Sequence, residues 1–120
     1  MTVSHVTAHV LDTTAGRPAA GVVVRLDRAE GAVDNHGDGG WAAVARSVTD
    51  DDGRVGDLGP ATLPAGTYRL TFETGAYFAA AGVETFFPYV PVVFTVDTTG
   101  RHYHVPLLVS PFALSSYRGS

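Results

Sequence analysis

The chain has 120 residues and a mass of 12.5 kDa, and 45% of its residues are hydrophobic and 17% charged, which indicates one globular domain over residues 1–120. It has no cysteine, which excludes a disulfide framework, a thiol nucleophile and cysteine-ligated metal sites. Its 8 basic residues are all arginine, which excludes a lysine Schiff base. With 12 acidic residues the net charge is -4, so neither nucleic acid nor an anionic membrane is expected as a partner.

The termini carry no recognisable targeting signal. The segment Met1–His5 has no basic stretch followed by an apolar run, so we expect no signal peptide. No segment approaches the roughly 18 apolar residues of a membrane span. The final Arg-Gly-Ser differs from a peroxisomal Ser-Lys-Leu signal. These features together predict a cytoplasmic protein.

A two-residue period runs through the first half of the chain. In residues 2–12, the apolar residues Val6, Ala8 and Val10 alternate with polar ones, which predicts a strand with its histidines, His5 and His9, facing away from the core. Further strands are expected over residues 21–28 and 41–49. Turns at 13–18 and 50–53 and a long loop over 29–40 separate the segments.

The second half continues with a strand over residues 68–73, then the single helical segment. Thr74–Gly82 is predicted to be a helix, with Thr74 as its N-cap and Gly82 as its stop. Two prolines, Pro88 and Pro91, favour an edge or strand-start position over a central one for a strand over 90–96. Strands at 101–109 and 113–117 bring the total to seven or eight, with one short helix. The pattern predicts an all-β fold, an antiparallel β-sandwich.

Three histidines are candidate functional residues. His102 and His104 lie on one face of the predicted strand, about 6.6 Å apart, so both imidazoles can reach one ligand. His9 lies on the exposed face of the first strand. Each could instead be a surface or structural histidine. Together they could form a catalytic zinc site, but no carboxylate stands at a recognisable supporting distance in sequence, so we predict no metal.

Other polar motifs carry less weight. Arg54 follows an Asp-rich turn, where an arginine is usually solvated. Residues 34–45 resemble a calcium loop only in part, because Ala45 stands where the bidentate Glu is required. The chain ends Tyr117-Arg-Gly-Ser120, and such tails are usually frayed. An arginine and a hydroxyl there could also complete the site of a neighbouring subunit.

Several of these segments resemble one family closely. Tyr103–Phe112, with the sequence YHVPLLVSPF, and the end SYRGS at 116–120 are similar to the C-terminal signature of the 5-hydroxyisourate hydrolases, the transthyretin-related proteins of urate breakdown. The segments HVLD at 9–12, GRPA at 16–19 and TDDDGR at 49–54 resemble the family's earlier motifs. The resemblance extends over nearly the whole chain.

The resemblance implies a transthyretin-like (prealbumin-like) sandwich that assembles as a homotetramer, a dimer of dimers, with sites in the channel between dimers. It implies hydrolysis of 5-hydroxyisourate to 2-oxo-4-hydroxy-4-carboxy-5-ureidoimidazoline, on the way to allantoin, without a cofactor. The matched catalytic residues are His9, Arg54, His104 and Ser120. Tyr117 matches a substrate-binding residue, together with His9 and Arg54, while His102 and Arg118 are expected to support the site from behind.

Within this reading, either His104 or His9 could deprotonate the attacking water, because an imidazole titrates near neutral pH. Arg54 would bind the substrate and stabilise developing negative charge. The family pattern is broken in two places. The 28–40 segment is longer than usual, which suggests a loop insertion, and Ala113-Leu114 stands where Gly-Tyr is usual. The alternatives are a transthyretin-like carrier without catalysis and an adhesion or carbohydrate-binding sandwich.

Overall fold

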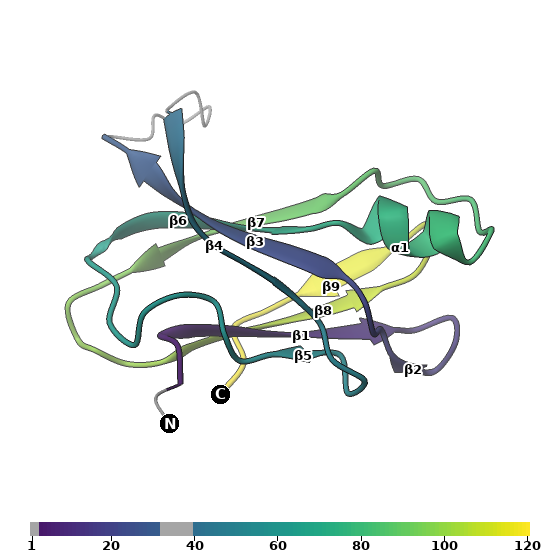
Figure 1. Cartoon of the computed structure of the whole chain (residues 1–120), viewed down its shortest axis with the longest axis horizontal. Coiled ribbons are helices and arrows are strands. Elements are labelled where there is room, and N and C mark those ends of the chain that lie inside the picture. Colours follow the sequence, from purple (N-terminus) through teal and green to yellow (C-terminus); the bar gives the residue numbers. More distant parts are fainter. Residues whose placement is uncertain (1–2, 32–39) are drawn as a thin grey trace.

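The protein is represented by a computed structural model that describes residues 3–31 and 40–120. Within them, two β-sheets pack face to face and one helix, α1 (Thr74–Ala80), lies at one end (Figure 1). One sheet has the order β2-β1-β8-β9, with β5 also paired to β1; its strands are β1 (Val6–Asp12), β2 (Arg17–Pro18), β5 (Arg54–Val55), β8 (Tyr103–Val109) and β9 (Leu114–Ser116). The other has the order β4-β3-β6-β7; its strands are β3 (Val23–Glu30), β4 (Gly40–Val48), β6 (Gly66–Phe72) and β7 (Val90–Val96).

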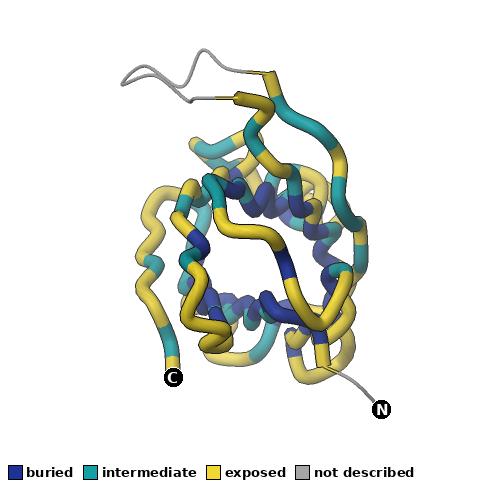
Figure 2. Tube along the Cα trace, turned by 90° about the vertical axis from the view of Figure 1, so that its left-hand side faces the viewer, coloured by how far each residue is buried: buried dark blue, intermediate teal, exposed yellow. Residues whose placement is uncertain are grey.

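The core lies between the two sheets and follows the two-residue period of the sequence. Along β1, every second side chain is buried, beginning with Val6, while Thr7, His9 and Leu11 are half-buried on the outer face. Figure 2 shows buried segments of both sheets lining the space between them. Burial of each large aliphatic side chain contributes about 1.5–3 kcal/mol. The largest of the fully buried side chains are Val6, Val10, Val22, Val24, Leu26, Leu58, Tyr68, Leu70, Phe72, Val96, Leu107 and Val109.

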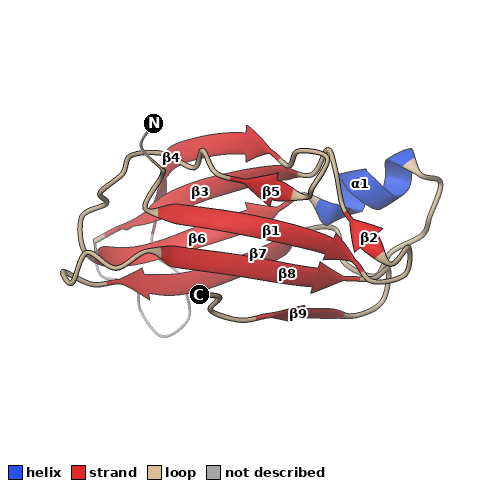
Figure 3. Ribbon diagram, turned by 90° about the horizontal axis from the view of Figure 1, so that it is seen from below, coloured by secondary structure: helices blue, strands red, loops and turns tan. Residues whose placement is uncertain are grey.

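The predicted β-sandwich with one short helix is confirmed, with one exception to its antiparallel pairing. β1 and β8 run in the same direction, side by side, at the middle of their sheet (Figure 3). Their register places Thr7 opposite His104 and His9 opposite Pro106. Local alternation within a strand carries no information about strand direction, so the sequence pattern could not predict this pair.

Strand positions agree with the sequence pattern, while some boundaries differ. β7 spans Val90–Val96 as expected and lies at the edge of its sheet. The predicted 29–40 loop is shorter than expected, since β3 continues to Glu30 and β4 begins at Gly40. The rest of that predicted loop insertion, residues 32–39, lies outside the described residues. Two strands of two residues each, β2 and β5, were not predicted because a strand so short has no period.

The start of the helix differs from the prediction. Thr74 is its first residue and is fully buried, and Glu73 occupies the N-cap position without a side-chain hydrogen bond to the helix. The start of α1 is therefore determined by packing at the end of the sandwich and not by a hydroxyl N-cap. At the other end, Gly82 adopts φ +70 and its N–H donates to the carbonyl of Ala79, which confirms the predicted stop.

His5 was expected on the exposed face and is instead buried. It precedes β1, and its Nδ1 accepts the N–H of Leu63 at 2.8 Å. The proton is therefore on Nε2, which donates to the carbonyl of Arg101 at 2.9 Å. Each ring nitrogen is used in a bond to backbone, so His5 is a structural residue that joins β1 to two loops.

The turn before β5 positions Arg54. Asp50 Oδ1 accepts the backbone N–H of Asp52 and of Arg54, at 2.9 and 3.0 Å. Gly53 adopts φ +73, and its carbonyl accepts the N–H of Val10 at 2.8 Å. β5 therefore pairs with β1 so that Arg54 lies opposite His9. An acidic turn that looks merely solvated in sequence thus holds the backbone of Arg54 beside β1.

We expect Gly53→Ala to lower the free energy of unfolding by about 2 kcal/mol or more, measured by urea denaturation. A Cβ at Gly53 would overlap the carbonyl oxygen of Val10, and φ +73 disfavours any L side chain. Gly16→Ala is the matched control, because Gly16 has a similar φ of +70 and open space around it. It should cost only about 1 kcal/mol. Equal losses in the two variants would show that the close approach to Val10 is unimportant.

Candidate active site

His102, just before β8, and His104, on β8, both contact the hydroxyl of Thr7. Thr7 Oγ1 lies 2.8 Å from His102 Nε2 and 2.8 Å from His104 Nδ1. Both imidazoles therefore contact one neighbouring side chain. His104 Nε2 has no hydrogen-bond partner among residues 3–31 and 40–120, which leaves it available to a bound molecule.

His9 and Arg54 lie beside each other on the adjoining strands. His9 Nε2 donates to the carbonyl of Asp52 at 2.8 Å, because a carbonyl can only accept. Its Nδ1 is then the nitrogen able to accept a proton or a hydrogen bond. Arg54, directly opposite on β5, is exposed, with its five N–H donors available for a planar ligand.

The C-terminal tail passes over His104. Gly119 donates its N–H to the carbonyl of His104 at 2.8 Å and forms an isolated bridge with it. A Cβ at Gly119 would lie 2.7 Å from His104 Cδ2 and 3.1 Å from Pro106 Cγ, so only glycine fits this approach without displacement. The tail backbone therefore packs directly on the imidazole.

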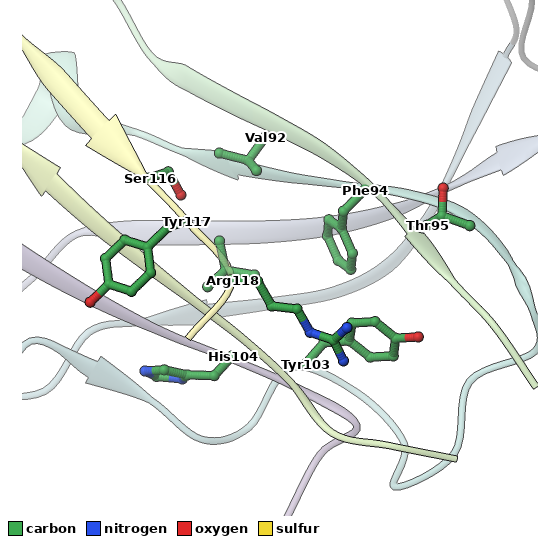
Figure 4. Close-up of a pocket in the computed structure, with 9 residues that line it drawn as sticks. Val92, Phe94, Thr95, Tyr103, His104, Ser116, Tyr117 and Arg118 are labelled. Atoms are coloured by element: carbon green, nitrogen blue, oxygen red, sulfur yellow. The ribbon is translucent and has the colours of Figure 1, made fainter. Parts of the chain in front are cut away.

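Arg118 anchors this tail. Its guanidinium carbon lies 4.5 Å from the centre of the Tyr103 ring, a cation–π arrangement, and its Nη2 donates weakly to the carbonyl of His102 at 3.4 Å. Figure 4 shows the Arg118 guanidinium beside Tyr103, while the His104 imidazole extends in another direction. Ser120 follows as an exposed residue. Arg118 thus holds the tail against Tyr103 and His102.

The environment of His104 favours its neutral form. Burial lowers the pKa of His104 from its ordinary value of 6.5, and the nearby positive charge of His9, Arg54 and His102 lowers the pKa further. A neutral imidazole with a free Nε2 can act as a base at neutral pH. The free Nε2 of His104 and its lowered pKa are therefore both compatible with the role of a base.

A pocket of about 290 Å³ opens beside the tail, between β7 and β8 (Figure 4). His104, Tyr117 and Arg118 line it together with apolar side chains from β7 and β8. His9 and Arg54 do not line it. They lie on the outer face of their sheet, so His104 and the tail stand at the boundary between this pocket and that face.

The structure brings together most residues singled out in the sequence. His9, Arg54 and His104 share one face across three adjacent strands, and His102 contacts that group through Thr7. Thr7 and Gly119 were missed. Thr7 shares its strand face with His9 in the sequence pattern, but its importance depends on the register with β8. Gly119 stands within the SYRGS motif but was not singled out, because its role depends on the tail folding back onto β8.

No group of three or more His, Asp or Glu side chains has an arrangement able to hold a metal within the part of the chain described. The described residues likewise include no helix long and apolar enough to cross a membrane.

Comparison with known proteins gives the family. Residues 6–119 match the model of the HIUase/Transthyretin family. The chain belongs to this family. It is 44% identical to 5-hydroxyisourate hydrolase of Mus musculus, over 98% of this chain and 96% of the mouse protein.

Two solved structures of the family have the same fold. The 5-hydroxyisourate hydrolase of Klebsiella pneumoniae is 42% identical with a TM-score of 0.81, over 96% of this chain and 98% of that one. Sea bream transthyretin in complex with thyroxine is 33% identical with a TM-score of 0.84, over 95% and 93%. The fold is therefore shared by a hydrolase and by a thyroxine-binding member, so the fold alone does not decide between the two functions.

We expect Gly119→Ala to loosen the tail on His104, because the added Cβ conflicts with the imidazole. Losing the bond to the His104 carbonyl would cost about 1 kcal/mol, so hydrogen exchange at the amide of position 119 should accelerate roughly fivefold. The resonances of the His104 ring should shift as well. Gly40→Ala is the control, since its Cβ would meet only Glu30 at 3.9 Å. An unchanged exchange rate in Gly119→Ala would contradict the close packing.

Proposed function

We propose that this protein hydrolyses 5-hydroxyisourate to 2-oxo-4-hydroxy-4-carboxy-5-ureidoimidazoline, within the breakdown of urate to allantoin. The observation that carries the proposal is the convergence of His9, Arg54 and His104 on one sheet face beneath a glycine-containing tail. The hydrolases among its relatives, similar over nearly their whole length, support the same activity. The protein acts as a single domain over residues 1–120.

In the proposed reaction, His104 deprotonates a water through its free Nε2, and the oxygen attacks a ring carbonyl carbon. His104 suits this role because its lowered pKa keeps it neutral near pH 7. His9, anchored through Nε2 on Asp52, offers Nδ1 to orient that water or a substrate N–H. The choice of His104 as base rests on its free nitrogen and its environment.

Arg54 binds the flat heterocycle and stabilises the oxyanion. Its planar fork matches adjacent carbonyl and ring-nitrogen acceptors, and donors of this kind are worth about 2.7–4 kcal/mol of transition-state stabilisation. Tyr117 contacts the substrate from the tail, and Ser120 contributes its hydroxyl. His102 and Arg118 hold the base and the tail in position, and no cofactor takes part.

The site is completed by assembly. On its own, the chain leaves Arg54, Tyr117 and Ser120 exposed on or beside an open sheet face. A homotetramer built as a dimer of dimers would cover this face and form the substrate channel. We propose this assembly for the protein in the cytoplasm, and equilibrium sedimentation of the purified protein tests it.

A carrier for a flat aromatic ligand is the second candidate, because sea bream transthyretin binds thyroxine on the same fold. The carrier would need no base and no free imidazole nitrogen on the sheet face. His104 Nε2, His9 Nδ1 and Arg54 together favour chemistry over carriage.

The first test follows the ultraviolet decay of 5-hydroxyisourate, generated from urate by urate oxidase. We expect the protein to accelerate the decay, and His104→Ala to lose at least about 100-fold of this acceleration, the usual contribution of a positioned base. A chelator should leave the rate unchanged. Loss of activity on chelation would instead move the histidines into a zinc site, and a folded tetramer without acceleration would favour the carrier.

The pH profile of kcat/KM tests the state of the base. Since the pKa of His104 is lowered, the residue stays neutral below its ordinary value of 6.5 and becomes protonated only at lower pH. Activity should therefore persist down to below pH 6.5 and then fall as the pH decreases. Rates are corrected at each pH for the spontaneous decay of the substrate. An acid limb centred above pH 6.5 would contradict this environment for the base.

Tail variants test the contribution of Ser120. Extension by a few residues beyond Ser120, or deletion of residues 117–120, should remove most activity while the sandwich remains folded, as judged by circular dichroism. The same extension placed at the N-terminus is the control and should be tolerated. Full turnover by a C-terminally extended tetramer would show that Ser120 has no catalytic role.

A further inference from the structure

The hydroxyl of Thr7 lies at the centre of a hydrogen-bonded series of three side chains, His104, Thr7 and His102. It is 2.8 Å from His104 Nδ1 on one side and 2.8 Å from His102 Nε2 on the other. A hydroxyl has one proton to donate, so at most one of these two nitrogens can receive it. The other ring nitrogen must carry a proton and donate to Oγ1. The protonation states of the two histidines are therefore linked through Thr7.

This hydrogen-bonded series of side chains leads from the site to solvent. Thr7 is held opposite His104 by the parallel register of β1 and β8, and both residues are half-buried. His102 precedes β8 and is exposed. A positive charge on His102 is therefore hydrated, whereas the same charge on His104 is partly desolvated.

The groups around His104 oppose a charge there. His9 on β1, Arg54 on β5 and His102 before β8 all act on this imidazole in the same direction. Arg54 is a permanent cation. A proton retained on His104 as imidazolium would be repelled by Arg54, whereas its transfer to His102 would remove the charge from the site.

We propose that Thr7 is a positioning residue that holds His104 with its Nε2 lone pair free and relays the abstracted proton to His102. This inference rests on the proposed hydrolase function. In the resting state, His104 Nδ1–H donates to Thr7 Oγ1, and the Thr7 hydroxyl donates to His102 Nε2.

Every proton that one group in the relay releases is taken up by the next group. Water loses a proton to His104 Nε2 as its oxygen bonds to the ring carbonyl carbon. The Nδ1 proton moves to Thr7 Oγ1, whose own proton moves to His102 Nε2. His104 is then neutral and protonated on Nε2, and His102 is an imidazolium in solvent. When the ring C–N bond breaks, His104 Nε2–H protonates the leaving nitrogen, and the relay runs in reverse to restore the resting state.

The test compares two substitutions of Thr7 in the full-length protein. Thr7→Val keeps the shape and removes the hydroxyl, and we expect kcat to fall at least tenfold with KM little changed. Thr7→Ser retains the hydroxyl and should restore most of kcat. The control is Thr13→Val, which removes a threonine hydroxyl bond to the carbonyl of Val109 at the far end of the same strand pair. Its kcat should equal that of the wild type.

A second readout needs no substrate. Nitrogen-15 spectra of the imidazoles should show His104 as the Nδ1–H tautomer in the wild type and in Thr7→Ser, and a shift toward Nε2–H in Thr7→Val. His102→Gln should retain a hydrogen bond to Thr7 but lower kcat, because an amide cannot take up the proton.

The outcomes separate the two proposals. A wild-type protein that fails to accelerate 5-hydroxyisourate decay overturns the proposed function. An active wild type whose Thr7→Val variant keeps its kcat, or a wild-type His104 found as the Nε2–H tautomer, overturns the role of Thr7 alone. Retained kcat in His102→Gln would overturn the relay.

Discussion

The parallel pairing of β1 with β8 is the constraint on which the site depends. It places Thr7 opposite His104, and the antiparallel pairing of β1 with β5 places Arg54 opposite His9. A shift of one residue in either register would turn one strand's polar side chains toward the core. The hydrophobic alternation that buries Val6, Ala8 and Val10 therefore also determines which functional groups meet on the outer face.

Backbone contacts orient the side chains of this face. Asp52 accepts from His9 through its carbonyl, and Gly119 packs its main chain against the His104 ring. Side chains held in this way lose little further freedom when a ligand binds, which favours catalysis by positioning. The tail packs on His104, whose burial lowers the pKa of the imidazole, so a terminal segment that looks dispensable helps to keep this residue neutral.

Much of the fold could be predicted, because it follows from local periodicity. Alternation located β1, β3, β6 and β8, and β7 lies at a sheet edge, one of the two positions that its prolines favour. The predictions were wrong where packing between distant segments determines whether a side chain is buried. His5 continues the alternation of β1 on paper but is buried by bonds to Leu63 and Arg101, far along the chain. Thr74 looked like a helix cap but is enclosed by the end of the sandwich.

The sequence by itself determined the strands, the class of fold and, through its family motifs, the candidate residues His9, Arg54, His104, Tyr117 and Ser120. Tertiary structure alone decided that Thr7 joins two histidines, that Gly119 lies on one of them, and that Arg54 lies opposite His9. The physical reason is the range of the interactions. Side-chain alternation depends on neighbouring residues, whereas register and close approach depend on segments that are separated in the chain, as Thr7 and His104 are.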